Sequence, residues 1–169
     1  MDVNDLVDLE LIKRLKYKYL RCLDQKLWDE IAGCFTPDAV AEYSAGAYSH
    51  EGRDAIVEFL RTSMGSEQML SSHRCHHPEI DFTGTDDQGR RTATGTWALE
   101  DVVLLLDWDL SLRGAAWYTD QYVKDGDTWR IARTGYRRTY EEVHSREGIP
   151  GLRLTAHWWT TGGRSELEA

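Results

Sequence analysis

The chain has 169 residues, of which 41% are hydrophobic and 29% charged, with a formal net charge of -9 at pH 7. This length and balance predict one globular domain rather than a disordered chain. The acidic charge argues against nucleic acid as a partner, because like charges repel. The start MDVNDLVDLE lacks the features of a secretory signal. The longest aliphatic run (102–106) is too short to span a membrane. The three cysteines form no CxxC pair. We therefore expect a reduced, cytoplasmic protein without membrane contact.

The first third of the chain predicts helices around one hairpin. Apolar residues at helical spacing predict a helix over 5–23, capped by Asn4 or Asp5. A second helix is expected within 25–35, where Thr36-Pro37-Asp38 stops it. The segment DAVAEYSAGAYSHEG alternates and turns like a hairpin, and a third helix follows from Gly52 to about Met64.

The remainder predicts strands over 70–83, 91–106, 115–124 and 128–140, the last two joined by a tight turn at 125–127. Helices followed by long antiparallel strands favour an α+β fold, with one curved sheet and the helices packed on one face. We expect a single domain over 1–148. Residues 149–169 are expected to form a loosely ordered tail or to pack on a neighbouring subunit, with Trp158 and Trp159 docking there or closing over the pocket.

Strand alternation places two charged residues on inward faces. In 92–103 the face that contains Trp97 also contains Asp101, and a buried carboxylate needs a partner. In 130–140 the predicted inward face is Ala132, Thr134, Tyr136, Arg138 and Tyr140. A strand bulge would exchange the two faces of this last strand.

The strand that starts near Ser71 places His73, Cys75 and His77 on one side. Together with Asp101 they could bind a metal, but the spacing matches no zinc signature, so we expect no metal. His73 could also be a core histidine bonded to a backbone carbonyl. The third interpretation pairs His73 with Asp101, whose carboxylate would fix the imidazole tautomer and make His73 a general base.

Tyr19 and Asp24 stand at the end of the first predicted helix. Tyr19 could simply be a core aromatic, and Asp24 could be the N-cap of the second helix. Five residues correspond to about 140° of helical rotation, so both side chains reach one pocket only if the helix ends between them.

The blocks KYKYLRCLDQKLWDE, SSHRCHHPEI, TATGTWALED and WYTDQYVKDGDTWRIARTGYRRTYEE follow, in this order, the pattern of the bile acid 7α-dehydratase family. That family lies within the nuclear transport factor 2-like, SnoaL-like superfamily, which also includes scytalone dehydratase and ketosteroid isomerase. The resemblance covers roughly residues 9–148 and implies a cone-shaped α+β barrel. One departure is the segment 102–114, which looks shorter than in the bile acid enzymes and lacks an expected tyrosine.

The resemblance also implies a site and a chemistry. Its catalytic residues fall on Tyr19, Asp24, His73, Asp101 and Arg138. Tyr43 falls on a pocket tyrosine, and we expect Trp97 and Tyr136 to contact the substrate beside it. The implied reaction removes water from a small, hydrophobic, steroid-like or polycyclic hydroxy-ketone, with no metal or organic cofactor, in a homotrimer.

In the implied mechanism His73 takes the proton, Asp101 holds the imidazole, Tyr19 stabilises oxygen charge, and Asp24 and Arg138 order the network. Two alternatives stay open: an isomerase or polyketide cyclase on the same fold, and a non-catalytic scaffold or binding subunit. A scaffold has no need for a buried Tyr-His-Asp set.

Overall fold

The structure is a computed structural model that describes residues 2–167. Its helices are α1 (Val3–Asp24), α2 (Trp28–Ala32) and α3 (Arg53–Met64), with short 3-10 turns η1 (Ser44–Gly46) and η2 (Leu106–Trp108). Its strands are β1 (Phe35–Tyr43), β2 (Tyr48–Glu51), β3 (Met69–Thr85), β4 (Arg91–Leu105), β5 (Leu110–Asp125) and β6 (Thr128–Ser145). The expected order of helices, hairpin and long strands is confirmed.

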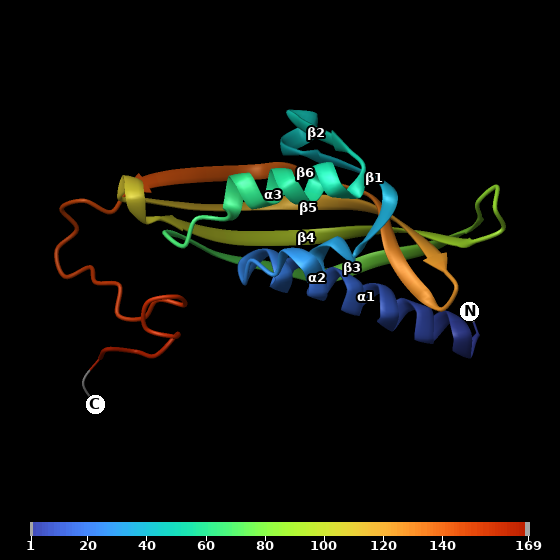
Figure 1. Cartoon of the computed structure of the whole chain (residues 1–169), viewed down its shortest axis with the longest axis horizontal. Coiled ribbons are helices and arrows are strands. Elements are labelled where there is room, and N and C mark those ends of the chain that lie inside the picture. The colour runs from blue at the N-terminus through green and yellow to red at the C-terminus, as the bar shows by residue number, and fades with distance from the viewer. Residues whose placement is uncertain (1, 168–169) are drawn as a thin grey trace.

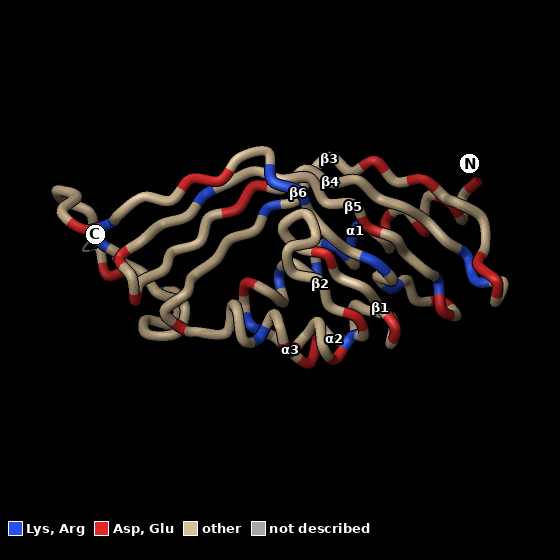
Figure 2. The backbone as a smooth tube through the Cα atoms, turned by 90° about the horizontal axis from the view of Figure 1, so that it is seen from above, with Lys and Arg blue, Asp and Glu red and all other residues tan. Residues whose placement is uncertain are grey.

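The strands form one six-stranded sheet in the order β2-β1-β6-β5-β4-β3. All neighbours are antiparallel except β1 and β6, which run parallel, so the sheet is mixed. The four long strands run side by side along the molecule (Figure 1) and arch over the helices, which lie on the concave face (Figure 2). The predicted α+β fold with a curved, mostly antiparallel sheet is therefore confirmed.

The core lies between the concave face and the helices. Helix α1 buries one side along its length, and α3 buries Ile56, Val57 and Leu60. The opposing sheet face contributes side chains that alternate along β4 and β5, as expected for strands with one buried face. The fully buried aromatic side chains of this core are Tyr19, Phe35, Trp97, Tyr118 and Tyr122.

Two helix boundaries differ from the prediction. Helix α1 begins earlier, because Asp2 caps it and exchanges hydrogen bonds with Asp5 in a capping box, so the expected caps Asn4 and Asp5 are wrong. The second helix is only Trp28–Ala32, and its N-cap is Leu27. The interpretation of Asp24 as a helix cap is therefore wrong, since Asp24 is the last residue of α1.

Bulges correct the predicted strand faces. In β6 the register with β5 shifts twice. Ile131 and Arg133 pair with consecutive residues of β5, so Ala132 is the extra residue of a first bulge. Arg138 and Tyr140 do the same, so Thr139 is the extra residue of a second bulge. The first bulge inserts an extra residue between Ile131 and Thr134, and the side chains of both of these residues are fully buried. After the second bulge Tyr140 lies on the outer face, 50% exposed, so its expected inward placement is wrong. In β3 a shift after His76 places His77 on the exposed surface, apart from Cys75.

Beyond Ser145 the chain forms no helix or strand up to residue 167, the last that the structure describes. This segment leaves the sheet at the end of β6 and finishes at the opposite end of the molecule from the N-terminus (Figure 1). The Lys26 ammonium lies 4.6 Å from the centre of the Trp159 ring. None of the helices among the described residues is long and apolar enough to cross a membrane.

Candidate active site

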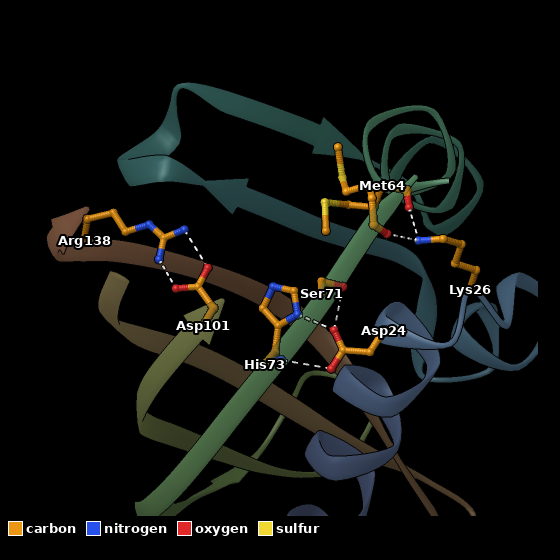
Figure 3. Close-up of polar contacts among 8 residues, drawn as sticks. Asp24, Lys26, Met64, Ser71, His73, Asp101 and Arg138 are labelled. Carbon is orange, nitrogen blue, oxygen red and sulfur yellow. Dashed lines mark hydrogen bonds and ion pairs between the residues drawn. The ribbon is translucent and has the colours of Figure 1, made fainter. Parts of the chain in front are cut away.

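The last residue of α1 meets β3 at a histidine. The Nδ1 atom of His73 lies 2.6 Å from Oδ1 of Asp24, and the backbone N–H of His73 donates to Oδ2 at 2.9 Å. The Ser71 hydroxyl donates to Oδ1 at 2.8 Å. Figure 3 shows all three contacts converging on one carboxylate. Asp24 therefore fixes both the position and the orientation of the imidazole.

The turn after α1 fastens this end of the helix to α3 and β3. Lys26 adopts a left-handed conformation with φ 57°, which ends the helix and redirects the chain. Its ammonium then donates to the carbonyl oxygens of Met64 at 2.6 Å and Met69 at 3.0 Å. Because Met64 ends α3 and Met69 begins β3, Lys26 ties three segments together beside Asp24 (Figure 3).

The electrostatics of Asp24 favour its ionised form. Burial alone would raise the pKa of this carboxyl. The hydrogen bonds from His73 and Ser71 outweigh burial, and the pKa falls below its ordinary value of 3.8. At neutral pH an anionic carboxylate thus accepts from Nδ1, which leaves Nε2 as the ring nitrogen that can take a proton.

His73 also forms part of the wall of a cavity of about 300 Å³ between α1, α3 and the sheet. Besides His73, five tyrosines, four apolar residues and one serine line this cavity: Tyr19, Tyr43, Tyr48, Tyr118, Tyr136, Leu23, Phe59, Leu60, Met64 and Ser63. Such a volume and lining are typical of pockets for small organic molecules.

The hydroxyls of Tyr19 and Tyr43 lie 3.0 Å apart. Burial raises the pKa of both phenols well above their ordinary value of 10.0. Both therefore stay protonated across the working pH range. Because each hydroxyl has one proton, one of the two donates to the other, and the second can donate to an oxygen atom in the cavity. The expected places of Tyr19, Tyr43 and Tyr136 in one pocket with His73 agree with this lining.

Asp101 has a different partner from the one expected. It is the cross-strand neighbour of His73, so the two residues share a face of the sheet. Its two carboxylate oxygens nevertheless accept from Nη1 and Nη2 of Arg138 at 2.5 and 2.8 Å (Figure 3). Among the described residues the acid bonded to the His73 ring is Asp24, so the predicted His73–Asp101 hydrogen bond is wrong.

A glycine makes room for the Asp101–Arg138 pair. Gly114 lies opposite Asp101 in β5, and a Cβ atom there would lie 2.9 Å from Nη1 of Arg138 and 2.8 Å from a backbone oxygen. The guanidinium also sits 5.0 Å from the centre of the Tyr136 ring, which lines the cavity. Arg138 thus connects Asp101 to the cavity wall.

Trp97 does not belong to the cavity lining. Its side chain is fully buried, and Nε1 donates to the hydroxyl of Tyr122 at 2.9 Å. The structure therefore places this expected substrate contact in the core. Two tyrosines of the cavity, Tyr48 and Tyr118, were not among the expected site residues, although strand alternation places Tyr118 on the buried face of β5.

No group of three or more His, Cys, Asp or Glu residues in the described part of the chain is arranged to hold a metal ion. His73 and Cys75 lie on β3, but His77 is turned to the surface by the bulge, where its Nδ1 lies 2.7 Å from that of His76. The four residues of the alternative metal site are thus not brought together.

Comparisons with known proteins agree with this architecture. A putative scytalone dehydratase from Novosphingobium aromaticivorans superposes with a TM-score of 0.74 at 22% identity, covering 90% of this chain and 100% of that one. A hexachlorocyclohexane dehydrochlorinase from Novosphingobium barchaimii gives 0.76 at 18% identity, covering 91% and 100%. An uncharacterized protein of Mycobacterium tuberculosis is 24% identical over 143 residues, covering 85% of this chain and 93% of the relative.

At these identities the superposed structures show a shared fold. The family assignment rests on the sequence: the pattern of the SnoaL-like domain matches residues 4–135, from the second residue of α1 into β6. The match includes Tyr19, Asp24, His73 and Asp101. The chain therefore belongs to the SnoaL-like domain family.

Proposed function

We propose that the protein is a lyase that eliminates water from a small hydrophobic hydroxy-ketone, with His73 as the general base and Asp24 as its orienting acid. The observation that supports this most directly is the Asp24–His73 contact of 2.6 Å at the wall of a tyrosine-lined cavity. A base held by a carboxylate and facing an apolar pocket is suited to take a proton from carbon.

In the proposed reaction Nε2 of His73 takes a proton from the carbon next to the hydroxyl-bearing carbon. The electrons of that C–H bond form the new C=C bond, and the C–O bond breaks on the neighbouring carbon. The imidazolium returns its proton to the departing hydroxide, which leaves as water. Asp24 stabilises the imidazolium while it carries the charge.

The tyrosines would act on the carbonyl group. Proton removal beside a conjugated carbonyl moves negative charge onto its oxygen, and the hydrogen-bonded pair of Tyr19 and Tyr43 can donate a hydroxyl proton to that oxygen. A donor aimed at developing charge is worth about 3–4 kcal/mol of transition-state stabilisation. Asp101 and Arg138 support the wall beside Tyr136 rather than the base.

The lining of the cavity supports the proposed substrate class. The cavity of about 300 Å³ is bounded by aromatic and aliphatic side chains, which suits a steroid-like or polycyclic alicyclic skeleton. Two proteins that share the fold are named for a dehydratase and a dehydrochlorinase, and both names describe eliminations. These names support elimination as the reaction class for this chain.

The test is a product assay with purified protein and a panel of polycyclic hydroxy-ketones. Mass spectrometry should show loss of one water from a substrate of this class, and His73→Ala should slow this reaction by about 10²–10⁴-fold. His144→Ala, which removes an exposed histidine of β6, is the matched control and should leave turnover unchanged. A product of unchanged mass would instead identify an isomerase, and no turnover of any member would contradict the proposal.

A further inference from the structure

A buried ion pair lies beneath the tyrosines of the cavity. Lys16 of α1 and Asp120 of β5 approach to 2.7 Å, and both side chains are 0% exposed. Neither residue lines the cavity, and the elimination described above uses neither. Two fully buried charges cost several kcal/mol each in lost hydration, so stability alone does not account for them.

Asp120 is held in place by neutral donors as well as by Lys16. The Thr134 hydroxyl donates to Oδ1 at 2.7 Å, and the Tyr122 hydroxyl donates to Oδ2 at 2.6 Å. Trp97 in turn donates to the Tyr122 hydroxyl at 2.9 Å. The carboxylate is therefore a fixed anchor, and it determines where the Lys16 ammonium sits.

The ammonium is directed at the cavity wall. Its nitrogen lies 3.4 Å from the centre of the Tyr118 ring and 5.1 Å from the centre of the Tyr19 ring. Both tyrosines line the cavity that His73 also lines. A cation over a ring face attracts its π electrons, and this contact is strongest where water is absent. Electron density withdrawn from the ring makes the phenol O–H a better hydrogen-bond donor.

We propose that Lys16, anchored by Asp120, is a positioning residue that polarises Tyr118, and that Tyr118 is a catalytic donor to the oxygen that gains charge during the reaction. The proposal rests on the proposed function, because it assigns a further donor to the same reaction. Tyr118 is protonated in this role, since burial raises the pKa of its phenol well above 10.0.

The first experiment removes the charges and keeps the shapes. Lys16→Met alone would leave Asp120 as an unpaired buried charge, so the variant to use is Lys16→Met with Asp120→Asn, whose amide can still bond to Thr134 and Tyr122. We expect a folded protein in which kcat falls about 10-fold while KM stays within about 2-fold, in line with a desolvated cation–π contact. Lys13→Met, a partly exposed lysine of the same helix, should change neither.

The second experiment tests whether the pair acts through Tyr118. Tyr118→Phe should lower kcat by about 100-fold, the size of effect expected for one lost oxyanion donor. Neutralising the ion pair in the Tyr118→Phe background should then have little further effect, because its target is gone. Full additivity of the two losses, or unchanged kcat in the folded double variant, would overturn the proposal.

A binding measurement separates this proposal from the proposed function. 2-Naphthol places an acidic oxygen on a flat ring skeleton and needs no turnover, so its affinity reports on the donors directly. The wild type should bind it about 10-fold more tightly than the variant with both charges removed. Equal affinities, or no binding to the wild type, would refute the role of Lys16. If the affinities differ but no hydroxy-ketone is dehydrated, the proposed function and the catalytic role of Tyr118 fail, and only the polarisation of Tyr118 by Lys16 stands.

Discussion

His73 and Asp24 are joined by two hydrogen bonds, one through the ring Nδ1 atom at 2.6 Å and one through the backbone N–H at 2.9 Å. One carboxylate thus holds both the main chain and the side chain of the same histidine. A base fixed in this way loses little orientation entropy when it meets a substrate, which favours proton transfer. Ser71 completes the arrangement from the same strand.

Replacing His73 by alanine should remove the base and spare the fold. We expect kcat to fall by about 10²–10⁴, the usual contribution of a general base. The protein should stay folded but melt at a lower temperature, because Asp24 loses the hydrogen bond from the ring and keeps those from the His73 backbone and Ser71. Turnover and thermal melting measured on the same sample check this, and normal turnover in the folded variant would exclude His73 as the base.

Asp24→Asn keeps the shape of the side chain and removes its charge. It should lower kcat at the same step as His73→Ala, since an imidazolium without its anion is harder to form. The two losses should not add, because both act through one proton transfer. A double variant whose loss equals the product of the two single losses would show that Asp24 acts independently of His73.

The sequence identified the acids of the site but not their pairing. Strand alternation correctly placed His73 and Asp101 on one face, and they are cross-strand neighbours. Alternation does not reveal that Gly114 leaves room for the Arg138 guanidinium to bind the Asp101 carboxylate. Residue type does not predict the left-handed turn at Lys26 beside Asp24 either, because lysine has no preference for that conformation.

The elements themselves follow from local patterns, which is why the strands and most helices could be predicted from the sequence. The bulges at Ala132 and Thr139 could not, because a bulge depends on the register with β5 rather than on residue type alone. The same limit explains why the predicted inward placement of Tyr140 is wrong: strand alternation predicts an inward side chain, and the second bulge turns it outward. Trp97 was expected in the pocket because alternation reports burial and does not distinguish core from cavity.

Asp101→Asn should act mainly on stability. It removes the charge that binds both nitrogens of Arg138, and a lost charged hydrogen bond costs about 1.5–3 kcal/mol of unfolding free energy. Urea denaturation measures this loss. In the folded fraction kcat should fall less than in Asp24→Asn, because Asp24 and not Asp101 contacts the base. A larger loss of kcat in Asp101→Asn than in Asp24→Asn would show that Asp101, and not Asp24, orients His73.

The cysteines should be unreactive in the folded protein. Burial raises the pKa of Cys34 and Cys75 to about 12, and it also raises the pKa of Cys22. Since the thiolate is the reactive form, iodoacetamide at pH 8 should alkylate all three slowly in buffer and quickly in denaturing urea. Mass spectrometry of the alkylated chain gives the rates. Fast labelling of Cys75 in native protein would contradict the raised pKa of its partly buried thiol.

Asp24 should also contribute to the acid sensitivity of the fold. Its pKa is lower in the folded protein than the ordinary value of 3.8, because hydrogen bonds from His73 and Ser71 outweigh the effect of burial. A carboxyl of this kind stabilises the fold fully above its unfolded pKa, and the stabilisation is lost as pH falls through the folded value. The free energy of unfolding of the wild type should therefore exceed that of Asp24→Asn most clearly above the ordinary carboxyl range. The difference should shrink as pH falls below 3.8.

Other buried carboxyls such as Asp8 titrate in both proteins and cancel in the comparison. Asp107→Asn, which changes an exposed acid, controls for net charge. Urea denaturation of the three proteins from pH 3 to pH 8 measures the effect, and a difference that widens in acid would show that Asp24 is not stabilised as an anion.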